Sequence, residues 1–124
     1  MYRVMIVDDE PLILAGIASM IDWSAQNMEI ICKASNGQQA LEQMKEQRPD
    51  IVITDIKMPG MNGLELMRTA REQGYDGVAF ILLTNLEEFQ LAKEALRLGA
   101  VDYLVKMELT EEKLRESLQH AIEK

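Results

Sequence analysis

The sequence predicts an α/β fold in which five strands and five helices alternate along a single domain. Short runs rich in β-branched and large apolar residues recur five times, and stretches with apolar residues at helical spacing separate them. Polar residues directly follow several of these strand-like runs. Five successive βα units imply a parallel sheet with right-handed crossovers and helices on both faces.

The expected strands are Arg3–Val7, Glu29–Ala34, Ile51–Thr54, Val78–Thr84 and Val101–Lys106. The runs that lead to Asp8, Asp55 and Thr84 are the most continuously apolar, which indicates central strands covered on both sides. This pattern favours a flavodoxin-like (βα)5 fold with strand order 2-1-3-4-5. In that arrangement, a crevice lies beside strands one and three.

Helix signals fill the intervals between the strands. The first expected helix runs from Pro11 to about Met20, and the second from a cap at Ser35 or Asn36 to before Pro49. The third runs from near Leu64 to Gly74, and the fourth ends at Gly99. The fifth begins after a cap at Thr110. The fourth carries Phe89, Ala92 and Leu96 on one face. The fifth has Leu114, Leu118 and Ile122 facing inward.

Composition narrows the possible functions. The chain has 124 residues and a net charge of −8, which argues against this domain binding DNA or an anionic membrane by itself. Its single cysteine, Cys32, rules out an intrachain disulfide and favours a reducing compartment. No apolar run approaches the roughly 20 residues of a membrane span, and the first residues lack a signal-peptide pattern. We therefore expect a cytoplasmic protein.

Charged and hydroxyl side chains stand at the ends of four strand-like runs: Asp8 and Asp9, then Asp55, Thr84 and Lys106. Because carboxyl ends of parallel strands meet at one edge, these side chains should converge. At about 5 Å and an effective dielectric constant near 20, two carboxylates repel by about 3 kcal/mol. A hard cation such as Mg²⁺ relieves that repulsion. The alternative, that the aspartates merely cap helices, leaves the matching Thr84 and Lys106 unexplained.

Three segments carry a resemblance to a known family: Val7–Pro11, Thr54–Gly63 and Gly99–Lys106. In sequence, order and spacing they closely resemble the receiver domains of two-component response regulators, and the likeness covers essentially the whole chain. More loosely, Asp22-Trp23 and Glu88–Ala100 look like receivers that precede an AraC-type helix-turn-helix output domain.

The resemblance implies a role for each site residue. Asp55 would accept a phosphoryl group from a phosphohistidine on a partner histidine kinase. Asp8, Asp9, Asp55 and the backbone carbonyl of Lys57 would hold Mg²⁺, with Asp8 acting mainly through a bound water. Lys106 would pair with the phosphoryl group, and the Thr84 hydroxyl would donate a hydrogen bond to it. Such a domain catalyses only its own phosphorylation and dephosphorylation, so it is a signalling module rather than an enzyme.

The resemblance also implies how the signal leaves the domain. Thr84 and Tyr103 would form a switch: Thr84 moves toward the phosphate and the ring of Tyr103 turns inward. The output face would comprise the fourth helix, fifth strand and fifth helix, where Lys93, Arg97, Asp102 and Arg115 could pair between the protomers of a homodimer. Residues 1–124 would be the receiver domain. A transcription-regulating output domain, the only part to contact DNA, would lie outside this chain.

Several positions depart from the family pattern. Met107 follows Lys106 where most receivers have a proline after a cis bond, so we expect a trans bond and a reshaped loop. Asn85 follows Thr84 where a smaller residue is usual, which predicts slow labelling by small phosphodonors. Lys57 and Leu86 flank the path of an attacking water and predict slow self-hydrolysis.

The sequence also bears on three other functions. A degenerate receiver that acts as a phosphorylation-independent interaction module is favoured by Met107 and Asn85, but opposed by the intact acidic residues, Thr84 and Lys106. A flavin-binding relative needs a hydroxyl- and glycine-rich phosphate loop after the first strand, where this chain has Asp9, Glu10 and Pro11. A phosphatase of the haloacid dehalogenase type needs a two-aspartate motif that the sequence lacks.

Overall fold

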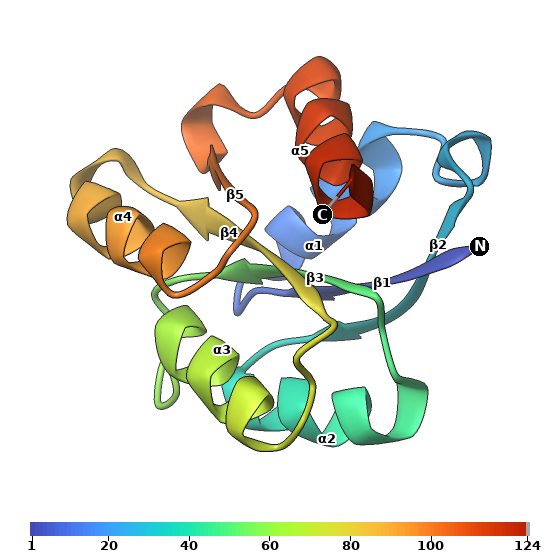
Figure 1. Ribbon diagram of the computed structural model, residues 1–124. Coiled ribbons are helices and arrows are strands. Elements are labelled where there is room, and N and C mark those ends of the chain that lie inside the picture. The colour runs from blue at the N-terminus through green and yellow to red at the C-terminus, as the bar shows by residue number, and fades with distance from the viewer. Residues whose placement is uncertain (124) are drawn as a thin grey trace.

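The computed structural model, which describes residues 1–123, has a central parallel sheet between two layers of helices (Figure 1). The strand order is β2-β1-β3-β4-β5, which confirms the predicted topology. The strands are β1 Tyr2–Val7, β2 Met28–Ala34, β3 Ile51–Asp55, β4 Ala79–Thr84 and β5 Asp102–Val105. No strand end differs from its predicted position by more than one residue. Lys106, predicted as the last residue of the fifth strand, lies just after β5.

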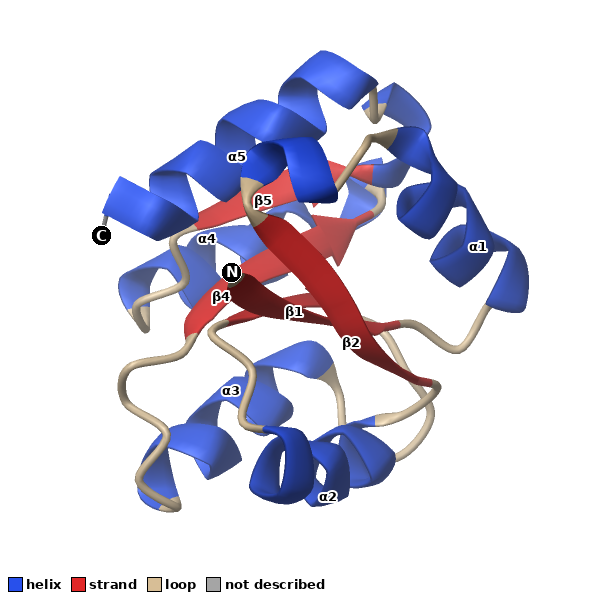
Figure 2. Ribbon diagram, turned by 90° about the vertical axis from the view of Figure 1, so that its right-hand side faces the viewer, coloured by secondary structure: helices blue, strands red, loops and turns tan. Residues whose placement is uncertain are grey.

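The helices are α1 Pro11–Met20, α2 Gly37–Gln47, α3 Gly63–Glu72, α4 Phe89–Arg97 and α5 Glu111–Glu123. Short 3₁₀ turns lie at η1 Ser24–Gln26, η2 Leu86–Glu88 and η3 Lys106–Glu108. Figures 1 and 2 show α1 and α5 on one side of the sheet and α2 and α3 on the other. Within residues 1–123, no helix has both the length and the apolar character needed to cross a bilayer.

Alternate residues of the central strands supply two separate apolar layers. In β1, Val4 and Ile6 join the layer beneath α1 and α5, whereas Met5 and Val7 join the layer beneath α2, α3 and α4. All four side chains are fully buried. A strand buried on both faces needs apolar residues at every position, which explains the continuous apolar runs seen in the sequence.

Helix α4 packs through small side chains rather than large ones. Ala92 and Ala95 are fully buried, but Phe89 and Leu96 remain 50% and 38% exposed. Helix α4 begins directly after η2 and presents its alanine face to the sheet, so Phe89 and Leu96 lie at the edge of that contact. Grouping Phe89 and Leu96 with Ala92 on one face was therefore only partly right. The Lys93 ammonium lies 5.2 Å from the centroid of the Phe89 ring.

Polar caps fix several helix starts. Asn36, not Ser35, caps α2 by accepting a hydrogen bond from the backbone N–H of Gln39 at 2.8 Å. Thr110 accepts one from the backbone N–H of Lys113 at 3.1 Å, as predicted for α5. At α1 the N-cap residue is Glu10, whose side chain makes no capping hydrogen bond. Its carboxylate is therefore free for other contacts.

The connection from β5 to α5 runs through Lys106 and Met107, and the reshaped loop expected there stays a prediction. The peptide bonds of residues 1–123 are all trans, and this confirms the expectation for Lys106 and Met107. The chain then forms η3, in which Met107 is 82% exposed.

Within this chain, Asp102 ties β5 to α5. Its carboxylate accepts a hydrogen bond from Ser117 Oγ at 2.7 Å and lies 2.9 Å from His120 Nδ1. Arg115 pairs with Glu111 at 2.7 Å. Asp102 and Arg115, both considered for pairing between protomers, are thus already engaged within one chain.

Candidate functional site

Strand register brings the two central aspartates together. Val7 of β1 pairs with Thr54 of β3, so the next residues, Asp8 and Asp55, leave their strands at the same level. On the other side of β3, Asp55 pairs with Leu83, one residue before Thr84. Thr84 in turn pairs with Val105, one residue before Lys106. The five side chains singled out in the sequence therefore all lie at the carboxyl edge of the sheet.

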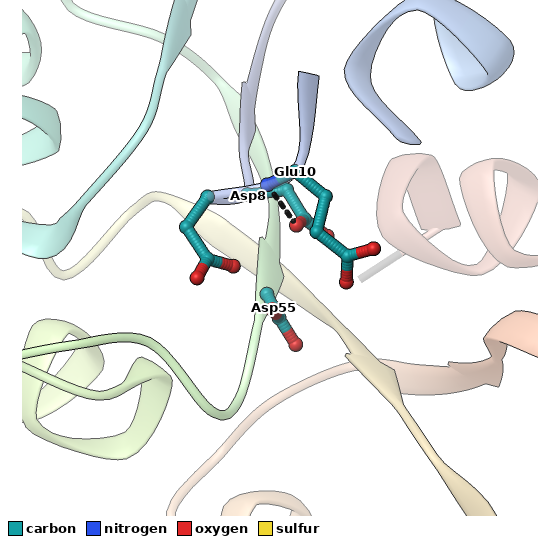
Figure 3. A group of neighbouring side chains, drawn as sticks. Asp8, Glu10 and Asp55 are labelled. Carbon is teal, nitrogen blue, oxygen red and sulfur yellow. Dashed lines mark hydrogen bonds between the residues drawn. The ribbon is translucent and has the colours of Figure 1, made fainter. Parts of the chain in front are cut away.

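Four carboxylates gather at this edge. Asp8, Asp9, Glu10 and Asp55 each offer an oxygen, and these oxygens all lie within 4.8 Å of one another. Figure 3 shows Asp8 and Glu10 on the segment that follows β1, with Asp55 at the end of the neighbouring strand β3. Asp8 and Asp55 are buried, whereas Asp9 and Glu10 are exposed. The predicted convergence of residues 8, 9 and 55 is confirmed.

The Lys106 ammonium is the central positive charge of the site. Its Nζ lies 3.0 Å from Asp8 Oδ2, 3.2 Å from Asp55 Oδ2 and 3.4 Å from Glu10 Oε1. The Lys106 side chain is only 10% exposed, so these contacts are largely shielded from water. One ammonium therefore offsets part of the repulsion among the acids.

Burial and crowding shift the protonation of these groups. Burial, reinforced by the Asp8 and Asp9 charges and opposed by Lys106, raises the pKa of Asp55 from 3.8 to about 6. Burial also raises the pKa of Asp8, although the backbone N–H of Glu10 and the Lys106 ammonium oppose the rise. Burial alone would lower the pKa of Lys106, but its hydrogen bond to Asp8 and the charges of Asp55 and Asp8 raise it. The site thus retains excess negative charge that calls for a second cation.

The donor set suits a small hard dication. Four carboxylates from two adjacent segments supply the oxygen ligands that Mg²⁺ and Ca²⁺ prefer. Within the described residues, Asp8 Oδ2 is buried and has the Lys106 ammonium 3.0 Å away as its charged neighbour. One ammonium offsets only part of the negative charge of four acids, so a second cation would stabilise the group. The residues present therefore fit a divalent cation.

The remaining predicted residues flank this cluster. Thr84 is buried at the end of β4, and Tyr103 is half-buried against the apolar layer beneath α4. The Lys57 side chain is exposed on the loop after β3. Among residues 1–123, no hydrogen bond joins the Thr84 hydroxyl to Asp55, and no ion pair joins Lys57 to it. These three residues are placed around the acids without touching Asp55 through polar atoms.

The β4–α4 loop is held by a buried acid. The backbone N–H of Asn85 donates a hydrogen bond to Glu88 Oε1 at 3.0 Å, and Glu88 is only 3% exposed. Leu86, between them, is 60% exposed. The expectations of slow labelling and slow self-hydrolysis that rest on Asn85, Leu86 and Lys57 stay predictions.

The loop after Asp55 returns tightly onto its own strand. The backbone N–H of Gly63 donates to the carbonyl of Ile56 at 2.8 Å, and a Cβ at Gly63 would lie only 2.5 Å from the carbonyl oxygen of Asp55. Gly60 adopts a φ of 76°, which glycine tolerates without strain. Close backbone approach therefore fixes where α3 begins relative to Asp55.

Glu10 is a member of the cluster to which sequence reasoning assigned no role at the site. It appeared only within the Val7–Pro11 segment and as one of the residues that argue against a flavin phosphate loop after the first strand. The available signal was its place directly after Asp8 and Asp9, together with an N-cap position that leaves its carboxylate unused.

Comparison with known proteins identifies this arrangement. Residues 4–119 match the family described as response regulator receiver domain. The chain belongs to this family. The receiver domain is 42% identical over 122 residues to the uncharacterized transcriptional regulatory protein YesN of Bacillus subtilis. That match covers 98% of this chain and 33% of YesN, so the chain spans a third of this curated relative.

Solved structures agree in fold. The receiver domain of AraT, a response regulator from Geobacillus stearothermophilus, is 39% identical with a TM-score of 0.89, covering 98% of this chain and 94% of that one. A chain of the CheX–CheY–BeF3–Mg²⁺ complex from Borrelia burgdorferi is 27% identical with a TM-score of 0.85, covering 98% and 89%. The predicted flavodoxin-like receiver fold is confirmed.

Proposed function

We propose that this receiver domain accepts a phosphoryl group on Asp55 from a partner histidine kinase in a Mg²⁺-dependent reaction. The observation that carries the proposal is the setting of the Asp55 carboxylate. It is buried, lies within 4.8 Å of oxygens of three other acids, and has the Lys106 ammonium 3.2 Å away. A nucleophile between a cation site and an ammonium is the arrangement that phosphoryl transfer requires.

Different residues of the chain would bind the cation, attack phosphorus and pair with the transferred group. Asp8, Asp9, Asp55 and the Lys57 carbonyl would hold Mg²⁺, which when bound neutralises charge on the phosphoryl oxygens. A carboxylate oxygen of Asp55 attacks phosphorus, and the bond from phosphorus to the imidazole nitrogen of the phosphohistidine breaks, leaving its electron pair on that nitrogen. With a pKa of about 6, Asp55 is mostly ionised at pH 7 and therefore nucleophilic. Lys106 pairs with an oxygen of the transferred group.

The output would be read on the other half of the domain. Thr84 moves toward the phosphoryl group, Tyr103 follows, and the face formed by α4, β5 and α5 changes, with homodimerisation one outcome. Support comes from the half-buried Tyr103 on β5 and the exposed Phe89 and Leu96 on α4. We further propose an AraC-type DNA-binding output domain in the full-length protein. The resemblance of Asp22-Trp23 and Glu88–Ala100 to receivers of that type supports it. The greater length of the transcriptional regulatory protein YesN, of which this chain covers 33%, agrees with an additional domain.

Beryllofluoride binding tests the proposal directly. Beryllofluoride with Mg²⁺ mimics an acyl phosphate, so it should raise the melting temperature of the wild-type domain, and Asp55→Asn should show no response. Asp76→Asn, which removes the same charge from an exposed loop position, is the matched control and should respond like the wild type. A wild-type domain that is not stabilised by beryllofluoride and Mg²⁺ would contradict the proposal.

One alternative can be tested with the same Asp55→Asn variant. A degenerate receiver that acts as an interaction module without phosphorylation is favoured by the departures at Asn85 and Met107, the latter 82% exposed beside Lys106. Such a module would bind its partner equally well as wild type and as Asp55→Asn. Loss of partner binding in Asp55→Asn alone would exclude it.

A further inference from the structure

Glu10 contacts the site through a side chain that takes no part in capping α1. Its backbone N–H donates to Asp8 Oδ1 at 2.9 Å, which anchors the residue beside the acids (Figure 3). Its side chain caps no helix, is 62% exposed, and lies 3.4 Å from the Lys106 ammonium. The carboxylate is therefore fixed at its base and free at its end, with Lys106 as its charged neighbour.

Lys106 and a divalent cation compete for the same oxygens. The ammonium contacts Asp8 Oδ2 and Asp55 Oδ2, and both aspartates also belong to the four-acid group suited to a metal. A dication placed on those oxygens would repel an ammonium only 3 to 4 Å away. Lys106 must then withdraw from Asp8 and Asp55, and Glu10 is the remaining acid within ion-pair distance of it in residues 1–123.

We propose that Glu10 is a positioning residue that holds Lys106 when a divalent cation occupies Asp8 and Asp55. The proposal rests on the proposed function, because it assumes that cation and phosphoryl group share this site. Glu10 strengthens cation binding in two ways: it adds a negative charge near the dication, and it receives the displaced ammonium. It opposes the phosphoryl group, because that group must draw Lys106 away from Glu10 and is itself repelled by the carboxylate.

Opposite effects on the two ligands separate this role from other roles. A direct metal ligand would, when neutralised, weaken binding of both the cation and the phosphoryl mimic. A solvated acid at the start of α1 would, when neutralised, change neither. A carboxylate that adds charge near the cation and competes with the phosphoryl group for Lys106 differs from both, because its neutralisation weakens cation binding and strengthens binding of the phosphoryl mimic.

The test compares Glu10→Gln with the wild-type domain at pH 7.5 and constant ionic strength. Calorimetric titration with Mg²⁺ alone should give a Kd about fivefold higher for Glu10→Gln, since one nearby charge is lost. Titration with beryllofluoride at saturating Mg²⁺, followed by ¹⁹F NMR of the bound fluoride, should give a Kd about threefold lower. Glu108→Gln is the matched control, because Glu108 pairs with Lys113 at 3.8 Å, and both of its constants should stay within twofold of the wild type.

Each other outcome overturns the inference. If Glu10→Gln binds both Mg²⁺ and beryllofluoride more weakly, Glu10 is a cation ligand. If both dissociation constants are unchanged, Glu10 is a solvated acid. If Glu108→Gln shows the same opposite shifts, the effect comes from net charge rather than from the Lys106 contact. A wild-type domain that responds neither to Mg²⁺ nor to beryllofluoride overturns the proposed function itself, which distinguishes the two failures.

Discussion

The two halves of the carboxyl edge hold their polar groups in different ways. At the ends of β1 and β3, Asp8 and Asp55 are buried, crowded by two further acids and bridged by Lys106. Beside them, two neutral side chains lie on β4 and β5: Thr84 is buried at the end of β4, and Tyr103 is half-buried within β5. Among residues 1–123, neither side chain forms a hydrogen bond with the acids. We call these the acidic half and the neutral half.

On the proposed function, this difference would separate the residues that carry out phosphoryl transfer from the residues that report it. Moving a charged group in the acidic half changes interactions of several kcal/mol, because buried charges at about 3 Å attract or repel strongly. Moving Thr84 or Tyr103 changes only ordinary hydrogen bonds and packing, which are worth about 1 kcal/mol each. A group that must move in response to a ligand is best placed where motion is inexpensive, and the neutral half has that property.

The largest expected effect comes from removing the bridging ammonium. Lys106→Met leaves Asp8 and Asp55 buried without their partner, and breaking such a pair typically costs about 3 kcal/mol or more of unfolding free energy. The loss should be measured by urea denaturation in EDTA and should be smaller at pH 5, where the carboxyl groups take up protons. Lys113→Met removes an exposed ion pair with Glu108 and should change stability by less than about 0.5 kcal/mol. Equal losses in both variants would contradict the comparison.

Removing the buried acid Asp55 should increase the unfolding free energy, whereas removing Lys106 should decrease it. The pKa of Asp55 is raised from 3.8 to about 6, so the folded state binds its proton more tightly than the unfolded state. Stability should fall as pH rises from about 4 to 6 and stay lower above that range, by about 2 to 3 kcal/mol. Asp55→Asn should lack this fall and be more stable than wild type at pH 7 in EDTA. Urea denaturation across that pH range measures the fall, with Asp76→Asn as the control. If stability depends on pH in the same way in wild type and Asp55→Asn, the prediction is refuted.

Substitutions in the neutral half should change the unfolding free energy of the ligand-free domain less than substitutions in the acidic half. Thr84→Val keeps the shape of the side chain but removes the hydroxyl, so the unfolding free energy should change by no more than about 1 kcal/mol. Affinity for beryllofluoride with Mg²⁺ should fall about tenfold, because one hydrogen bond to the phosphoryl mimic is lost. Titration followed by ¹⁹F NMR measures it. If Thr84→Val instead binds as tightly as the wild type, Thr84 does not contact the bound group.

The smallest expected effect belongs to Asp9. Asp9→Asn should raise the melting temperature of the metal-free domain by about 2 °C, since it removes one of the repelling charges. The rise should be smaller than that of Asp55→Asn because Asp9 is exposed and Asp55 is buried. Thermal melts in EDTA measure both. An Asp9→Asn variant as stable as or less stable than the wild type would indicate that water already screens this carboxylate.

The meeting of polar side chains at the strand ends was predictable, because it depends on how the strands pair and this pairing follows from the apolar pattern. Asp8, Asp55 and Lys106 follow apolar runs that could only be central or neighbouring parallel strands, so their meeting required no side-chain detail. The trans bond before Met107 was predictable for a similar reason, because the local chemistry of the peptide bond decides it.

Contacts that depend on how a helix is rotated or tilted were not predictable. The face of α4 that packs is set by its alanines, and an amphipathic pattern with Phe89 and Leu96 does not reveal that alanines permit the closest approach. The contacts of Asp102 with Ser117 and His120 depend on where α5 crosses β5, which no local pattern specifies. Glu10 was missed because its role depends on the reach of the Lys106 side chain from the far end of the sequence.

The closure of the loop after β3 has a mechanical consequence. Because Gly63 lies against the carbonyl oxygen of Asp55 with no room for even a methyl group, the first turn of α3 and the backbone of Asp55 must shift together. A force applied to α3 by any bound macromolecule would therefore reach Asp55 through direct atomic contact, without passing through the sheet. Replacement of this glycine by alanine would push on Asp55 from behind, so on the proposed function the tolerance of position 63 to change would depend on phosphoryl transfer as well as on folding.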